Sequence, residues 1–122
     1  MPPSARTFLD LGQRGSGTMQ AMFFHAVYFY PREDAKPGDA EALAAGCRHY
    51  LANIPSLTYF SVGHTAGTQR DVVDNDYCVA LLTGFADSEG HDAYQVHPDH
   101  LAFIEANKKY FSRVRIYDSL VA

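Results

Sequence analysis

The chain has 122 residues, a formal net charge of −4 and a hydrophobic content of 47%. That length suits one domain, and that composition is typical of a folded globular protein rather than a disordered chain. The acidic balance, without any run of three basic residues, disfavours nucleic acid and anionic membranes as partners, and no apolar stretch approaches the ~20 residues of a membrane span.

The sequence divides into an N-terminal extension, residues 1–22, and a domain, residues 23–122. The extension is rich in Gly, Ser and Pro, and its apolar cluster is short, running from Phe8 to Leu11. Two interpretations are open. The extension is either a disordered leader or a segment that docks Phe8 and Leu11 onto the domain or a partner chain.

The first part of the domain predicts a strand followed by a helix. Residues 23–30 are β-prone, and Pro31 stops the run. A helix is expected over 39–54, because Asp39 suits the N-cap position, apolar residues recur with helical spacing, and Pro55 forbids continuation.

Further strands are expected over 57–64 and 77–85, separated by a long polar loop that contains glycine. Asp87 then caps a short helix. A second helix begins at Pro98, since proline suits a first helical position, and it runs to about residue 110, so that the two form a kinked or broken helix. A last strand is expected over 113–121.

This order, β-α-β-β-α-β, predicts an α+β fold of ferredoxin-like topology: a four-stranded antiparallel sheet with the helices on one face. The second face should then be polar wherever it meets water. In the first strand, however, one face carries His25, Val27 and Phe29, and the other carries Phe24, Ala26, Tyr28 and Tyr30. Because a monomer rarely exposes so large an apolar patch, we predict a homodimer in which two sheets pack together into an α/β barrel.

The stretches FHAVYFY, IPSLTYFSVGH and AYQVHPDHLAF, together with the order of elements, resemble the stress-responsive A/B barrel (Dabb) family of dimeric α/β barrels. The resemblance covers roughly residues 23 to 118 and assigns the whole of 23–122 to such a domain. The family includes plant stress proteins, plant polyketide cyclases and many bacterial proteins with no known activity.

The resemblance also implies roles for single residues. In the cyclases, a tyrosine and the second histidine of the HPxH stretch line a pocket between sheet and helices and drive an aldol-type ring closure; these positions correspond to Tyr94 and His100. The strand-one histidine of that pocket corresponds to His25. Two cyclase positions differ, because Val79 stands where they have a histidine and Cys47 where they have a tyrosine. The ligand-pocket residues predicted on this basis are His25, His97, Val79, Val27 and Phe29.

His97 and His100 are three residues apart and share one side of the first helical turn, which Leu101 and Ile104 continue toward the core. The positive end of the helix dipole favours a neutral imidazole there, as a general base requires. The alternative is that a ring only bonds the backbone and fixes the kink. Tyr94 either shares a hydrogen bond with His100 in a pocket or is an ordinary core tyrosine.

His25 in an apolar strand needs a hydrogen-bonding partner, and we expect a tyrosine or a histidine. A metal site would require His25, His97 and His100 to converge, and HPDH lacks the spacing of the HExxH zinc motif, so we predict no metal and no cofactor. The other histidines lie in polar sequence and are expected to be solvated: His49, His64 and His91.

Cys47 and Cys78 lack CxxC spacing and are too few for a secreted disulfide scaffold, so reduced thiols and a cytoplasmic location are expected. The leading functional hypothesis is a dimeric stress-response-type protein that binds a small, largely apolar ligand between sheet and helices. One alternative is a cofactor-free polyketide-cyclase- or isomerase-like enzyme that uses His100 and Tyr94 as an acid/base pair. A small monooxygenase-like protein on the same barrel and a purely structural assembly protein also remain open.

Overall fold

The computed structural model describes residues 22–122, so the predicted extension lies outside the described residues except for Met22. The strands are β2 (Met22–Tyr30), β3 (Leu57–Gly63), β4 (Val79–Phe85) and β5 (Arg113–Val121). The helices are α1 (Asp39–Leu51), α2 (Ser88–Gln95), α3 (Pro98–Asn107) and the 3₁₀ turn η2 (Lys108–Tyr110).

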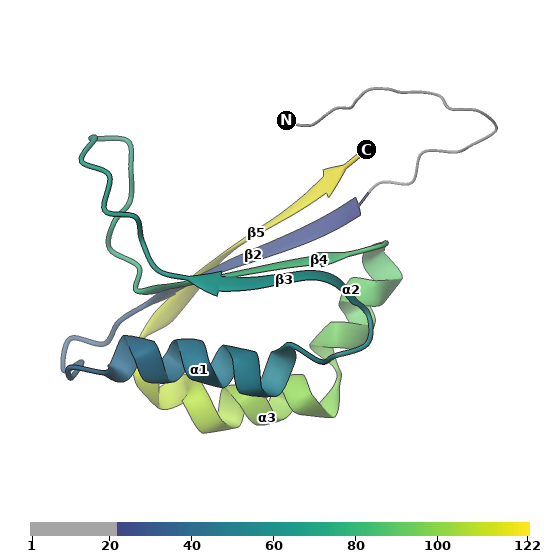
Figure 1. The fold of residues 1–122 in the computed structure, drawn as a ribbon, viewed down its shortest axis with the longest axis horizontal. Coiled ribbons are helices and arrows are strands. Elements are labelled where there is room, and N and C mark those ends of the chain that lie inside the picture. Colours follow the sequence, from purple (N-terminus) through teal and green to yellow (C-terminus); the bar gives the residue numbers. More distant parts are fainter. Residues whose placement is uncertain (1–21) are drawn as a thin grey trace.

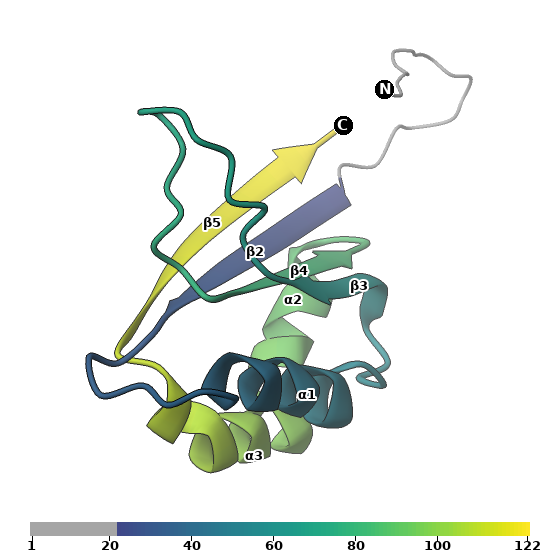
Figure 2. The ribbon, with the colours of Figure 1, turned by 60° about the vertical axis from the view of Figure 1, so that its left-hand side comes forward.

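The four strands form one antiparallel sheet in the order β3-β4-β2-β5. Helices α1 and α3 lie side by side on one side of this sheet, and α2 lies next to the end of β4 (Figure 1). A second view shows the helices on the same side of the sheet (Figure 2). The predicted ferredoxin-like α+β fold is therefore confirmed.

The main departures from the predicted boundaries are at α1. This helix is preceded by Gly38, whose φ of 94° lies in the left-handed region that glycine adopts readily, and it ends at Leu51 rather than at residue 54. The Asp39 carboxylate accepts a hydrogen bond from the Lys36 N–H and does not cap the helix. Ile54 follows in a turn but is still buried, 3% exposed.

The core lies between the helices and the face of the sheet that carries the odd-numbered residues of β2 and β4. Its largest contributors include Val27, Phe29, Leu43, Leu51, Val79, Leu81, Phe85, Tyr94 and Phe103. Gly46 brings α1 close to α3, because a side chain at this position would overlap Asn107. Asn107 is buried there and donates a hydrogen bond to the Phe103 carbonyl at 3.0 Å.

Strand β5 lies at the edge of the sheet and is exposed along its whole length. Among the described elements, helices contact β2, β3 and β4 but not β5, and β5 extends beyond the helices beside β2 (Figure 2). Its helix-side residues Val114 and Ile116 are therefore 39% and 46% exposed. They lie where the space between sheet and helices opens to the outside.

The second face of the sheet is apolar across its centre. Leu82, Ala26 and Tyr117 are register partners on β4, β2 and β5 and form one row across the sheet. Tyr28 in the next row contacts Tyr77 and Tyr117, with ring centroids 4.9 and 6.2 Å apart. No helix of the described part of the chain covers these residues, and Tyr117 is 55% exposed. Among residues 22–122, no helix has both the length and the apolar character needed to cross a membrane.

Candidate functional site

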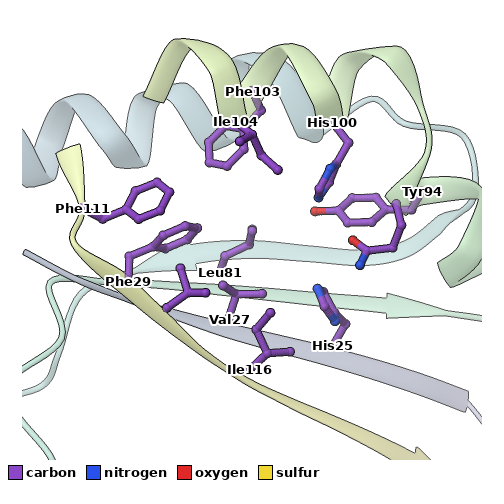
Figure 3. A pocket seen from close by; sticks show the side chains of 12 residues that line it. His25, Val27, Phe29, Leu81, Tyr94, His100, Phe103, Ile104, Phe111 and Ile116 are labelled. Carbon is purple, nitrogen blue, oxygen red and sulfur yellow. The ribbon is translucent and has the colours of Figure 1, made fainter. Parts of the chain in front are cut away.

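A pocket of about 270 Å³ lies between the helix-side face of the sheet and the helices α2 and α3. The polar residues that line it are His25, Tyr94, Gln95 and His100. His25, Tyr94 and His100 gather at one end, and Phe29 and Phe111 lie at the other (Figure 3). The remaining lining is mostly apolar and includes Val27, Leu81, Phe103, Ile104, Val114 and Ile116. The pocket thus has a hydrocarbon body and one polar end.

The kink between α2 and α3 positions the polar end. Tyr94 lies in the last turn of α2, and His100 lies in the first turn of α3. His97 caps α3, because its Nδ1 accepts a hydrogen bond from the Asp99 N–H at 3.0 Å, and Pro98 occupies the first turn. This connection brings the rings of Tyr94 and His100 into edge contact, with centroids 4.8 Å apart at an interplanar angle of 68°.

Two buried polar atoms at this end have no hydrogen-bond partner among residues 22–122: the hydroxyl oxygen of Tyr94 and Nδ1 of His100. The hydrogen bond between these two residues, which was one of the two alternatives for Tyr94, is therefore not formed. Buried polar groups are nearly always paired, and an unpaired one costs about 1–3 kcal/mol. Both atoms belong to residues that line the pocket, so a bound molecule with a polar group can satisfy them.

Both residues are held neutral. Burial raises the pKa of the Tyr94 phenol, and the nearby Cys47 adds to the effect. Burial also lowers the pKa of His100, assisted by His25 and His91. A neutral phenol is a hydrogen-bond donor and a neutral imidazole is a base, so the pair combines a donor with a proton acceptor.

His25 has the histidine partner that its burial predicts, and a second partner besides. Its Nδ1 lies 2.6 Å from an oxygen of Asp118 and 3.1 Å from Nε2 of His91. The prediction that His91 is solvated is wrong: it is 9% exposed, and its ring stacks on Phe23 with centroids 4.4 Å apart. His91 precedes Tyr94 by three residues on α2, which places both on the buried face of that helix.

The structure brings three of the five predicted ligand-pocket residues to the pocket, namely His25, Val27 and Phe29. It does not bring His97 there, since that side chain caps α3. Val79 is also absent from the pocket lining and is fully buried in the core.

One further expectation needs correction. Leu101 does not face the core, since it is 57% exposed, and the buried residues of α3 are Phe103 and Asn107. Cys47 and Cys78 are free thiols, as predicted. Burial raises the pKa of Cys47 to about 12, which keeps this thiol protonated and unreactive.

The histidines considered for a metal site, His25, His97 and His100, do not form a ligand cluster. The group of potential ligands that does converge within residues 22–122 is His25, His91 and Asp118, whose ligand atoms all lie within 4.8 Å of one another.

Comparison with known proteins shows which family the chain belongs to. The model of the stress responsive A/B barrel domain family matches residues 23–121, which confirms the resemblance inferred from the sequence. No curated protein matches the chain.

Several solved structures share the fold. A Dabb family protein with a ferredoxin-like fold from Mesorhizobium loti is 22% identical, with a TM-score of 0.66 over 82% of this chain and 96% of that one. A dimeric ferredoxin-like protein of unknown function from Thermobifida fusca is 19% identical, with a TM-score of 0.70 over 90% and 100%. Hydroxynitrile lyase from Passiflora edulis is 13% identical, with a TM-score of 0.70 over 85% and 96%.

Proposed function

Because this chain belongs to the stress responsive A/B barrel domain family, we propose that it is a dimeric protein whose pocket binds a small, largely apolar molecule carrying one hydrogen-bonding group. The observation that carries the proposal is the unpaired Tyr94 hydroxyl and His100 Nδ1 at the polar end of a mostly apolar pocket. The family name suggests a role in a stress response.

The pocket chemistry favours a carbonyl compound. The Tyr94 hydroxyl has a hydrogen to donate and a carbonyl oxygen accepts it, while the weakly acidic C–H next to that carbonyl can face the neutral His100 imidazole. The hydrocarbon part of such a ligand rests on Val27, Phe29 and Ile116, where each buried CH₂ contributes about 0.8 kcal/mol. Pairing the hydroxyl adds about 1 kcal/mol.

The first test fills the pocket from α3. Ile104 lines the pocket and is 41% exposed, so Ile104→Trp is expected to fill the opening and abolish binding of the probe acetophenone, an aromatic ketone, without unfolding the chain. Ligand-observed NMR measures the binding. Leu101→Trp is the matched control, since Leu101 lies on the same helix, is 57% exposed and does not line the pocket. Equal binding by both variants would place the site elsewhere.

A second candidate function is proton transfer at the same end of the pocket. It is favoured by the contact of the two rings and by their neutral state. His100 takes a proton from the carbon next to the ligand's carbonyl, the electron pair of that C–H bond forms the C=C bond of an enolate, and the enolate oxygen accepts the Tyr94 hydrogen bond. A protein with this fold, from Passiflora edulis, is a hydroxynitrile lyase, so catalysis occurs on this fold.

The proposed dimer forms through the uncovered face of the sheet. Leu82, Ala26 and Tyr117 form its central row, with the Tyr28 aromatic cluster beside it. Two such faces packed together remove both apolar surfaces from water. The Thermobifida fusca protein with the same fold is dimeric, which supports this arrangement.

A further inference from the structure

His25, His91 and Asp118 come from three separate elements and meet at one point. His25 on β2 and Asp118 on β5 are direct register partners in the sheet, and His91 reaches them from α2. The His25 Nδ1 atom lies 2.6 Å from Asp118 Oδ1 and 3.1 Å from His91 Nε2. This cluster has no part in the hydrogen bonding proposed for Tyr94 and His100.

Hydrogen bonding alone does not satisfy this cluster. The Nδ1 atom of His25 carries at most one hydrogen. If it carries that hydrogen, the Asp118 oxygen and the lone pair of His91 Nε2 compete for it. If it does not, its lone pair faces an oxygen of the ionised Asp118 carboxylate at 2.6 Å, without a hydrogen between them. In either case, at least one of the two contacts of His25 Nδ1 lacks a hydrogen bond of its own.

We propose that His25, His91 and Asp118 form a binding site for a divalent transition-metal ion of the Zn²⁺ type. Two imidazoles and one carboxylate are ligands that such ions prefer, and three protein ligands leave a coordination position open. One ion takes up all three lone pairs, whereas a single hydrogen does not.

The three ligand atoms lie within 4.8 Å of one another, and two of their separations can be compared directly with those around such an ion. Bonds of about 2.0–2.1 Å in a tetrahedral arrangement place ligand atoms about 3.4 Å apart. The His25–His91 separation of 3.1 Å is close to this value, and the His25–Asp118 separation of 2.6 Å must widen. Asp118 allows that movement, because it lies on the exposed edge strand and its side chain is 43% exposed.

The surroundings hold the two imidazoles in place. His25 is 3% exposed, and the Thr83 hydroxyl donates to its carbonyl at 2.8 Å. His91 stacks on Phe23 and packs edge-on against Phe85, at centroid distances of 4.4 and 5.4 Å. The exposed side of the site is therefore Asp118, which gives an ion access from solvent.

The metal site is separable from the ligand pocket, although His25 belongs to both. His91 and Asp118 do not line the pocket, so changing them tests the metal site without removing a pocket residue. The proposed metal site does not depend on the proposed ligand binding, so one of these two proposals can fail while the other holds.

Isothermal titration of the untagged full-length chain with Zn²⁺ tests the proposal. The expected result is one Zn²⁺ bound per chain, with affinity weakened at least tenfold by His91→Phe and by Asp118→Asn. His91→Phe keeps an aromatic ring against Phe23. The matched control is His49→Phe, the same substitution at an exposed histidine of α1, which should leave the affinity unchanged.

Co²⁺ supplies a second readout, because its visible absorption reports low-symmetry coordination by nitrogen and oxygen. The band should form with the parent chain and with His49→Phe but not with Asp118→Asn. Absence of Zn²⁺ binding, or equal Zn²⁺ affinity in Asp118→Asn and the parent chain, would overturn the proposal. If His91→Phe does not fold, as judged by circular dichroism, Asp118→Asn decides the matter alone, since its residue lies on an exposed edge strand.

Discussion

His100→Ala is expected to abolish exchange of the methyl hydrogens of acetophenone for deuterium in D₂O, if the pocket transfers protons as proposed. A positioned base contributes roughly 10²–10⁴-fold to such a step, so a loss of at least about 100-fold is predicted. Proton NMR follows the exchange directly. Because His100 is the neutral imidazole beside Tyr94 in the pocket, no other group in the proposed mechanism takes the proton.

His97→Ala is the matched control, with the same substitution three residues earlier in the chain. His97 caps α3, so this change should cost about 1 kcal/mol of stability and leave the exchange rate constant nearly unchanged. Equal exchange rates in His100→Ala and the parent chain would remove His100 from the mechanism.

The pH dependence of this exchange has a predicted sign. The base must be neutral, and burial lowers the pKa of His100 below the usual value of about 6.5 for histidine. The rate constant should therefore stay on its plateau as pH falls through 6.5 and decline only at lower pH. A decline centred above pH 6.5 would mean that another group is the base.

Leu82→Glu is expected to convert the dimer into monomers. Leu82 lies in the central row of the uncovered sheet face, opposite Ala26, so a carboxylate there would be buried without a partner in the proposed interface. Burying an unpaired charge costs several kcal/mol, which should raise the dissociation constant by at least about 100-fold. Sedimentation velocity at micromolar concentration measures the change.

Val72→Glu controls for the added charge, because Val72 is 79% exposed in the loop between β3 and β4. This variant should sediment like the parent chain. A parent chain that is folded and monomeric at these concentrations would contradict the proposed dimer.

Much of the fold was predictable because local patterns and tertiary structure agree. The β-prone runs, the cap at Asp87 and the proline at position 98 lie within a residue or two of observed element ends. The end of α1 was not predictable from apolar spacing, because Ile54 is buried although it lies in a turn that follows the helix. Apolar periodicity indicates which residues are buried. Because a residue in a turn can be buried as well as one in a helix, it does not show where a helix ends.

The candidate site was only partly predictable. The resemblance indicated Tyr94 and His100, and the cost of burying His25 indicated a partner. The burial of His91 was not predicted because its neighbours in the sequence are polar, whereas His91 itself packs against Phe23 from α2. Asp118 was not predicted as a partner of His25 because its position opposite His25 depends on the register of β2 and β5, which a single sequence leaves open.

The central claim is that Tyr94 donates a hydrogen bond to a ligand in the pocket, and one comparison of affinities tests it most directly. Acetophenone and ethylbenzene have nearly the same shape, and only the first has a carbonyl oxygen. By NMR titration, the parent chain should bind acetophenone about fivefold to tenfold more tightly than ethylbenzene, since one hydrogen bond contributes about 1 kcal/mol. Tyr94→Phe should reduce this ratio to about 1. A ratio that Tyr94→Phe leaves unchanged, or a parent chain that binds neither compound, would contradict the account.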